Sequence, residues 1–178
     1  MENFQVGCLI VGAVILSWQA GVAKQPHERL LFVALALFFV TFALREFDVR
    51  KGDWPVASTI LSGTVRNLWL GGLWLIIAWH GYRHRANAWA FGWRWLKSGA
   101  GRVILIAGLF WILGAAVDKI HPFGSRRRNM LGEELLEANA ALLMTFSALV
   151  SLLCSRKASD ENDLSTWTPA AEAHDGPI

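Results

Sequence analysis

Charged residues are scarce in this chain of 178 amino acids. Asp, Glu, Lys and Arg together make up 17% of it, whereas a soluble domain carries about 25%. Apolar residue types make up 54%, and the mean hydropathy is positive at +0.36. This composition excludes an ordinary soluble domain and indicates a protein that is embedded in a membrane.

Cysteine is also rare, since Cys8 and Cys154 are the two in the sequence. They stand at the outer ends of the first and last apolar stretches, which an odd number of spans would place at opposite membrane faces. An intramolecular disulfide is therefore not expected, because it requires Cα atoms within about 7 Å of each other. The two cysteines also lack the spacing of a metal site. Internal repeats, which many carriers contain, are lacking as well.

Five apolar stretches dominate what is present. A bilayer core about 30 Å thick takes roughly 20 apolar residues as a helix. Within lipid, each segment must satisfy its own backbone hydrogen bonds, which favours helices. We therefore expect an all-α integral membrane protein with about five transmembrane helices, at residues 4–23, 27–47, 55–82, 101–117 and 135–154. They form one expected bundle over residues 1–154, followed by a disordered polar tail over residues 155–178.

Between the third and fourth spans, residues 83–98 alternate Arg and Lys with Trp and Phe. This pattern is typical of an interfacial amphipathic segment that lies in the plane of the headgroups. The ten tryptophans of the chain agree with it, because indoles favour the membrane–water interface. Basic residues beside aromatic ones also bind nucleic acid, but the flanking spans argue against that. The lipid bilayer is the expected partner, and nucleic acid is not.

Membrane orientation is nearly balanced in the sequence. We call face A the side that holds the N-terminus and residues 48–54 and 119–132. Face B is the side that holds residues 24–27, residues 83–100 and the tail. Nine Lys and Arg residues fall at face B and eight at face A. Residues 83–102 contain five basic and no acidic residues, which favours face B as cytoplasmic. The three arginines at 126–128 favour the opposite. The sequence thus predicts an N-out, C-in topology.

Acidic residues are distributed far less evenly. Outside the tail, nine carboxylates are present, and eight of them belong to face A: Glu2, Glu46, Asp48, Asp53, Asp118, Glu133, Glu134 and Glu137. A charged group inside the bilayer is costly unless it is paired or hydrated. We therefore expect these groups to face one another. The simplest pairing sets Arg45 and Arg66 against some of Glu46, Asp48, Glu134 and Glu137.

Two interpretations of this face A cluster remain open. In the first it is structural: ion pairs hold the helices together, and acids at a helix N-terminus, which are favourable electrostatically, account for Glu133, Glu134 and Glu137. In the second it is a polar cavity that binds a cation or a lipid headgroup. The candidate catalytic residues are then Glu46, Asp48, Glu134 and Glu137, and the candidate binding residues are Arg45, Arg66, Asp118 and His121. Candidate ligands for a divalent cation, which prefers oxygen, are Glu46, Asp48, Asp118, His121, Glu134 and Glu137.

Two short motifs in the cluster carry a resemblance. Arg45-Glu46-Phe47-Asp48 ends the second span, and Glu133-Glu134-Leu135-Leu136-Glu137 begins the fifth. They resemble patterns in small uncharacterised bacterial multi-pass membrane proteins, in which an Arg-Glu-x-Asp and a Glu-Glu-x-x-Glu recur. The resemblance implies a bacterial inner membrane and a single site made from both motifs. It implies no activity.

Three classes of function are compatible with the sequence. The first is a binding protein whose cluster recognises a lipid headgroup, a cation or a membrane-protein partner. The second is a membrane-embedded hydrolase or transferase acting on lipid, with a Glu or Asp as base and a metal ion as a potential cofactor. The third is a small ion or proton carrier, in which buried carboxylates serve as relays. Whether the protein is an enzyme is left undecided by its sequence.

Overall fold

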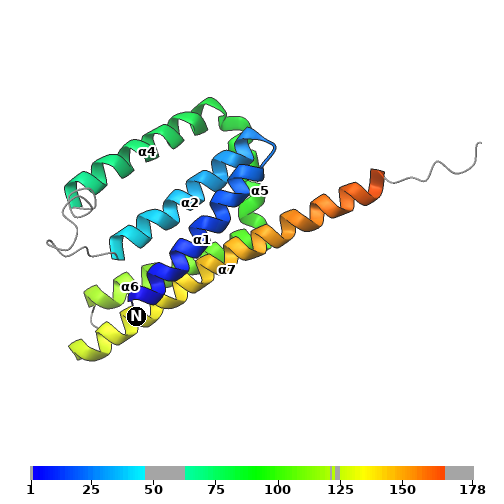
Figure 1. Ribbon diagram of the computed structural model, residues 1–178. Coiled ribbons are helices and arrows are strands. Elements are labelled where there is room, and N and C mark those ends of the chain that lie inside the picture. The colour runs from blue at the N-terminus through cyan, green and yellow to red at the C-terminus, as the bar shows by residue number, and fades with distance from the viewer. Residues whose placement is uncertain (1, 47–62, 121, 123–124, 167–178) are drawn as a thin grey trace, which may run out of the picture.

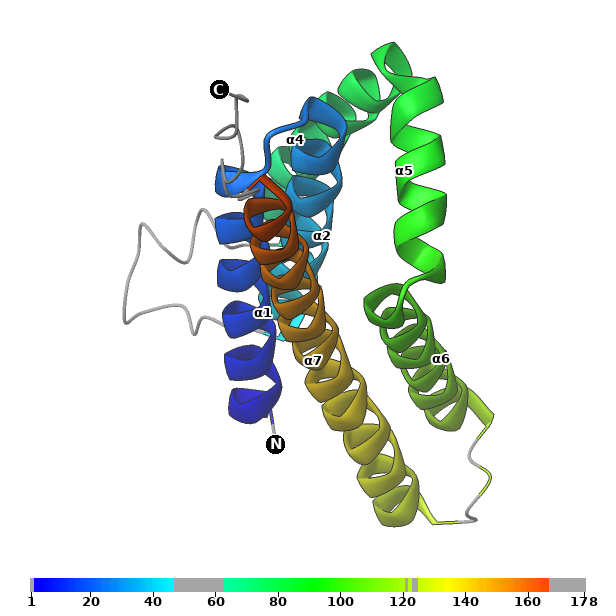
Figure 2. The same ribbon diagram turned by 90° about the vertical axis from the view of Figure 1, so that its right-hand side faces the viewer.

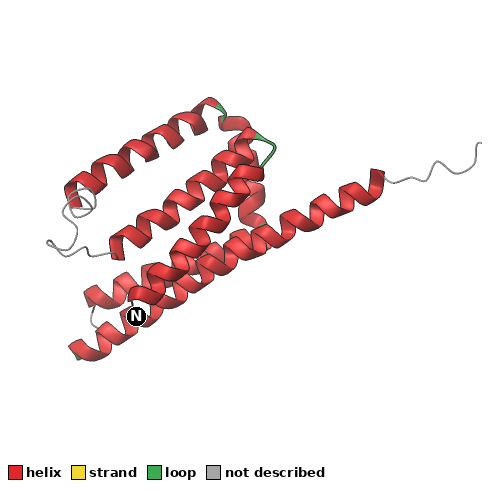
Figure 3. Cartoon of the chain, viewed as in Figure 1, coloured by secondary structure: helices red, strands yellow, loops and turns green. Residues whose placement is uncertain are grey.

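The computed structural model describes residues 2–46, 63–120, 122 and 125–166. Within these residues every regular element is a helix (Figure 3), which confirms the all-α prediction. The helices are α1 (Glu2–Val22), α2 (Pro26–Glu46), α4 (Gly63–Arg83), α5 (Arg85–Lys97), α6 (Gly99–Ile120) and α7 (Arg126–Thr166).

Four of these helices are long and apolar enough to cross a membrane. The segments are Asn3–Val22, Pro26–Arg45, Gly99–Ile120 and Arg127–Ser155. They overlap the predicted first, second, fourth and fifth spans. The predicted third span corresponds to α4, which has 21 residues but is not among the four. Its two adjacent glycines, its tryptophans and Arg66 lower its mean hydropathy. The predicted start of that helix at residue 55 lies outside the described residues.

The long helices run along a common axis, as Figure 1 shows. The N-terminus, the end of α2, the end of α6 and the start of α7 lie together at one end, which is face A. The turn between α1 and α2 lies at the other end, face B. There the shorter α5 runs across the common axis and connects the end of α4 to the start of α6 (Figures 1 and 2). Residues that are far apart in sequence therefore meet at face A.

Small residues allow α1, α2 and α7 to pack closely. On α7, Ala141, Thr145 and Ala148 are buried, and Ala138 is half-buried. On α1, a Cβ atom at Gly12 would overlap the ring of Phe39, which is completely buried. Close approach of this kind is the usual basis of helix association in membranes, because lipid removes the hydrophobic driving force.

Buried polar side chains also hold α1 against α7. Gln19 Nε2 donates to the carbonyl oxygen of Ala148 at 3.1 Å, and Ser151 Oγ donates to Gln19 Oε1 at 2.9 Å. Nearer the middle of the helices, Thr145 Oγ1 donates to the carbonyl oxygen of Cys8 at 2.6 Å. Each such bond contributes about 1 kcal/mol in a membrane. Together they define the register of the two helices.

The corner between α5 and α6 is tight. Ser98 Oγ accepts a hydrogen bond from the amide of Gly101 at 3.3 Å, as a helix N-cap residue does. A Cβ atom at Gly101 would overlap the backbone of Trp95 and Leu96, so glycine is needed at this corner. Trp95 Nε1 donates to Ser151 Oγ at 3.4 Å and so attaches α5 to α7.

Helix α7 is longer at both ends than the sequence predicts. It begins at Arg126 rather than at residue 135, and it continues to Thr166, past the predicted end of the span at Cys154. Residues 155–166, expected to belong to a disordered tail, are helical. A formed helix propagates more easily than a new one nucleates, and Arg, Lys, Ala and Glu in this stretch are good helix formers. Residues 167–178 lie outside the described part of the chain.

Candidate functional site

An ion pair joins α2 to α7 at face A. Arg45 Nη2 lies 2.8 Å from Glu137 Oε1, and the two residues are 92 positions apart in the sequence. The side chain of Glu137 is 10% exposed and that of Arg45 is 51% exposed. Glu137 is one of the four acids predicted from the sequence to pair with Arg45 or Arg66, and its pairing with Arg45 is confirmed. A buried carboxylate needs such a partner, because an unpaired one is strongly destabilising.

The acidic residues of α7 are not helix N-terminal residues, so this part of the structural interpretation is wrong. Because α7 begins at Arg126, Glu133 lies in its third turn and Glu137 one turn further on. The first turn contains no acidic residue, and the electrostatic benefit of a helix N-terminus fades within that turn. The ion pair with Arg45, rather than the helix N-terminus, is therefore the electrostatic contact that stabilises the Glu137 carboxylate.

Helix α6 makes room for this ion pair. Gly114 is buried, and a Cβ atom at this position would lie 3.3 Å from Glu137 Cγ and 3.5 Å from Leu136 Cβ. A side chain at this position would require Glu137 to shift by a few tenths of an ångström. Glu137 thus lies where α2, α6 and α7 meet.

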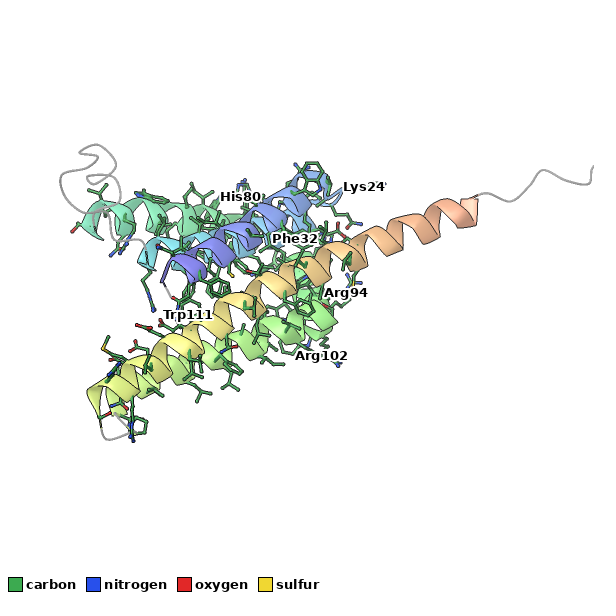
Figure 4. The ribbon with its side chains drawn as sticks, turned by 60° about the horizontal axis from the view of Figure 1, so that its bottom comes forward. Lys24, Phe32, His80, Arg94, Arg102 and Trp111 are labelled. Atoms are coloured by element: carbon green, nitrogen blue, oxygen red, sulfur yellow. The ribbon has the colours of Figure 1, made fainter. Side chains whose placement is uncertain are left out.

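Two aromatic rings lie beneath the guanidinium group of Arg45. Its Cζ atom lies 5.9 Å from the centre of the Phe42 ring and 5.5 Å from that of Trp111. The two rings pack edge to face, with centres 4.3 Å apart. Trp111 belongs to α6 and lies between the layer of α2 and the layer of α6 and α7 (Figure 4). Cation–π contacts of this kind position a charge over an apolar surface.

The indole N–H of Trp111 is buried and has no hydrogen-bond partner within the described residues. Trp111 is 8% exposed, so water reaches it poorly. A buried donor without an acceptor is costly. An acceptor that reached this N–H would therefore be bound favourably.

From the two rings an apolar groove extends between α2 and α6. Its volume is about 550 Å³. The lining residues come from α2, α4, α6 and α7, and they are Leu31, Ala34, Leu35, Phe38, Phe42, Trp74, Ile104, Gly108, Trp111, Ile112, Ala115 and Met144. On α2 they extend from Leu31 to Phe42, which are eleven steps apart, or about 16 Å along the helix axis. Apart from indole N–H groups, the side chains that line the groove are apolar.

Helix α4 is attached to α2 beside this groove. Arg66 Nη1 donates to the carbonyl oxygen of Leu44 at 2.5 Å, and Trp74 Nε1 donates to Thr41 Oγ1 at 3.4 Å. Leu44 lies in the last turn of α2, where carbonyl groups lack partners within the helix. Arg66 thus reaches the predicted cluster, where it donates to a backbone carbonyl of α2.

The other predicted site residues are distributed as follows. Glu134 is half-buried, and its carbonyl oxygen accepts a hydrogen bond from Gln5 Nε2 at 3.3 Å. Asp118 is exposed near the end of α6. The Glu46 side chain, Asp48 and His121 lie outside the description. Within the described part of the chain, no three His, Cys, Asp or Glu side chains converge as a metal site. Three candidate ligands of the predicted cation site, at Glu46, Asp48 and His121, have side chains outside that part.

Phe42, Trp111 and Gly114 are the site residues that sequence reasoning missed. Phe42 stands one turn before Arg45 on α2, which is a usable signal for an aromatic contact. Trp111 and Gly114 had no comparable signal, because an apolar span contains many such residues. In comparisons with known proteins, no family model, no curated protein and no solved structure matches this chain.

Proposed function

We propose that this protein is a multi-pass membrane protein that binds a phospholipid. In this proposal the groove between α2 and α6 holds an acyl chain, and the Arg45–Glu137 ion pair contacts the headgroup. The supporting observation is the continuity of the two parts: Phe42 and Trp111 line the end of the groove and also lie beneath Arg45.

The dimensions of the groove suit one apolar chain. Its volume of about 550 Å³ lies within the usual range of ligand sites. Its lining is apolar over about 16 Å, so a polar ligand would lose its hydration without compensation. A chain that moves from lipid into the groove gains little hydrophobic free energy, because it was already in an apolar medium. Selectivity must therefore come from the headgroup end.

The headgroup end offers donors. Arg45 is about half exposed and carries a planar fork that matches phosphate oxygens. The Trp111 N–H is a second donor without a described acceptor. Glu137, which remains paired with Arg45, adds a carboxylate that suits a headgroup amine. Phosphate is the shared feature of the headgroups that this set would recognise.

The placement of the protein in the membrane is part of the proposal. We place α4 as a fifth span, since its 21 residues cover about 31 Å and expose Leu68, Leu75 and Ile76. We place α5 in the headgroup region of face B, because it runs across the other helices (Figure 1). The five basic residues in 83–102 support a cytoplasmic face B. The two-motif resemblance supports a bacterial inner membrane.

Filling the groove tests its occupancy. A Cβ atom at Gly108, which lines the groove, meets nothing within 4 Å, so Gly108→Leu should occupy the groove without distorting α6. Gly7 on α1 is exposed and equally open, so Gly7→Leu is the matched control. We expect added phosphatidylglycerol to raise the unfolding temperature of the purified wild type and the control by several degrees, since a ligand that binds the folded state stabilises it.

The Gly108→Leu variant should lose most of this stabilisation. Arg45→Gln should weaken the response to phosphatidylglycerol but not the response to diacylglycerol, which lacks the phosphate. Equal stabilisation of wild type and Gly108→Leu would contradict a chain in the groove. Equal responses of Arg45→Gln and wild type to phosphatidylglycerol would contradict headgroup binding at Arg45.

A further inference from the structure

The exposed surface of α5 combines large aromatic rings with basic groups. Trp89 is 75% exposed and Trp93 is 51% exposed. Their rings are stacked, with centres 6.1 Å apart and planes inclined by 10°. Lys97 Nζ lies 5.6 Å from the centre of the Trp93 ring. Two indoles and a cation thus share one side of the helix.

The corner between α4 and α5 repeats this arrangement. Arg83 Cζ lies 5.7 Å from the ring centre of Trp79, and Arg85 Cζ lies 5.5 Å from that of Tyr82. A shallow hollow of about 670 Å³ at this corner is lined partly by Tyr82, Arg85 and Trp89. Each guanidinium group thus lies near an aromatic ring. Both arginines are exposed, so each can also contact an anion.

The charge at this end of the molecule is strongly positive. Residues 83–102 contain five basic residues and no acidic one. Lys24 of the α1–α2 turn and Arg102 of α6 lie at the same end as Arg94 (Figure 4). Helix α2 contributes Arg29 and the acidic Glu28 in its first turns. Glu28 is the one carboxylate at this end among the side chains that the structure describes, and these side chains together carry an excess of positive charge.

We infer that the surface formed by Arg83, Arg85, Trp89, Trp93, Arg94 and Lys97, named here the α5 surface, binds the phosphate groups of an anionic membrane leaflet. Indoles prefer the depth of the headgroups, and cations beside them meet phosphate there. Helix α5 runs across the long helices at their face B end, so its residues lie together at that end (Figure 1). This inference rests on the placement of α5 in the headgroup region of face B proposed above, but not on lipid binding in the groove at face A.

Spin-labelled lipids provide the test. The purified full-length protein is placed in phosphatidylcholine vesicles, and electron spin resonance measures how much spin-labelled phosphatidylglycerol or phosphatidylcholine is immobilised at the protein. The ratio of the two association constants is the selectivity for anionic lipid. The test variant is Arg85→Gln/Arg94→Gln/Lys97→Gln. The charge-conserving control is Arg85→Lys/Arg94→Lys, and the opposite-face control is Arg127→Gln/Arg128→Gln.

We expect the wild type to favour the anionic label, and 1 M salt to reduce that preference because it shortens the screening length to about 3 Å. The triple Gln variant should reduce the selectivity by roughly fivefold or more, since each Lys or Arg near an anionic surface contributes about a factor of five. The charge-conserving and opposite-face controls should keep most of it. Unchanged selectivity in the triple variant would overturn the inference, and it is the result expected if this surface binds an acidic protein instead. An equal loss of selectivity in the opposite-face control would also overturn it.

Discussion

Phe42 of α2 and Trp111 of α6 meet edge to face, with ring centres 4.3 Å apart, at the boundary between the apolar groove and the Arg45–Glu137 ion pair. Both residues line the groove. Their contact also supplies the surface on which the guanidinium group lies. An apolar and a charged site are thereby joined through two side chains.

Removing Arg45 should expose the dependence of Glu137 on its partner. Arg45→Leu leaves a carboxylate that is 10% exposed without this guanidinium, and we expect a loss of about 2–4 kcal/mol in unfolding free energy. Adding Glu137→Gln should restore part of it, because the uncompensated charge is gone. Unfolding in mixed micelles measures all the variants of the cycle.

Arg66→Leu is the matched control for this cycle. Arg66 donates to the Leu44 carbonyl rather than to Glu137, so its effect should add to that of Glu137→Gln without coupling. Strict additivity of Arg45→Leu with Glu137→Gln would contradict the ion pair as a stabilising contact.

Trp111→Phe should separate stability from lipid binding. The indole N–H has no described acceptor, so its removal should change the unfolding free energy by less than about 1 kcal/mol. The stabilisation by added phosphatidylglycerol should nevertheless fall, because a headgroup donor is lost. If the lipid response of Trp111→Phe equals that of the wild type, the N–H is not a headgroup donor.

Gly12→Val should destabilise the bundle by overpacking. Its side chain would collide with Phe39, and we expect a loss of about 1–3 kcal/mol. Gly21→Val is the control, because a Cβ atom there meets nothing within 4 Å. Combining Gly12→Val with Phe39→Leu should recover part of the stability. Equal stability of Gly12→Val and Gly21→Val in thermal unfolding would be inconsistent with the close α1–α2 contact.

Cysteine accessibility tests the proposed topology. In a Cys8→Ser/Cys154→Ser background, Asn87→Cys on α5 and Asn3→Cys on α1 introduce single exposed thiols. A membrane-impermeant maleimide added to intact cells should label Asn3→Cys alone, and inverted vesicles should give the opposite result. Labelling of both from one side would contradict the placement of these residues at opposite faces.

Much of the fold was determined by the sequence itself. A long apolar stretch in lipid must satisfy its own backbone hydrogen bonds, which favours a helix. The all-α class and four helices long and apolar enough to span a membrane therefore follow from composition and length. The placement of Asp118, Glu133, Glu134 and Glu137 at one end also follows, because the end of α6 and the start of α7 lie together there. The pairing of Arg45 with Glu137 was within reach, because the end of α2 lies at the same end.

Tertiary structure decided the rest. The rotation of each helix about its axis decides which acid pairs with Arg45, and it also decides that Arg66 reaches a carbonyl of α2. Hydropathy contains no information on this rotation. The groove is lined by residues of α2 and α6, and it depends on how these helices meet through Phe42 and Trp111, which are 69 positions apart in the sequence. The extension of α7 to Thr166 is likewise cooperative, since a helix formed within the bundle continues into a polar segment that would not start one alone.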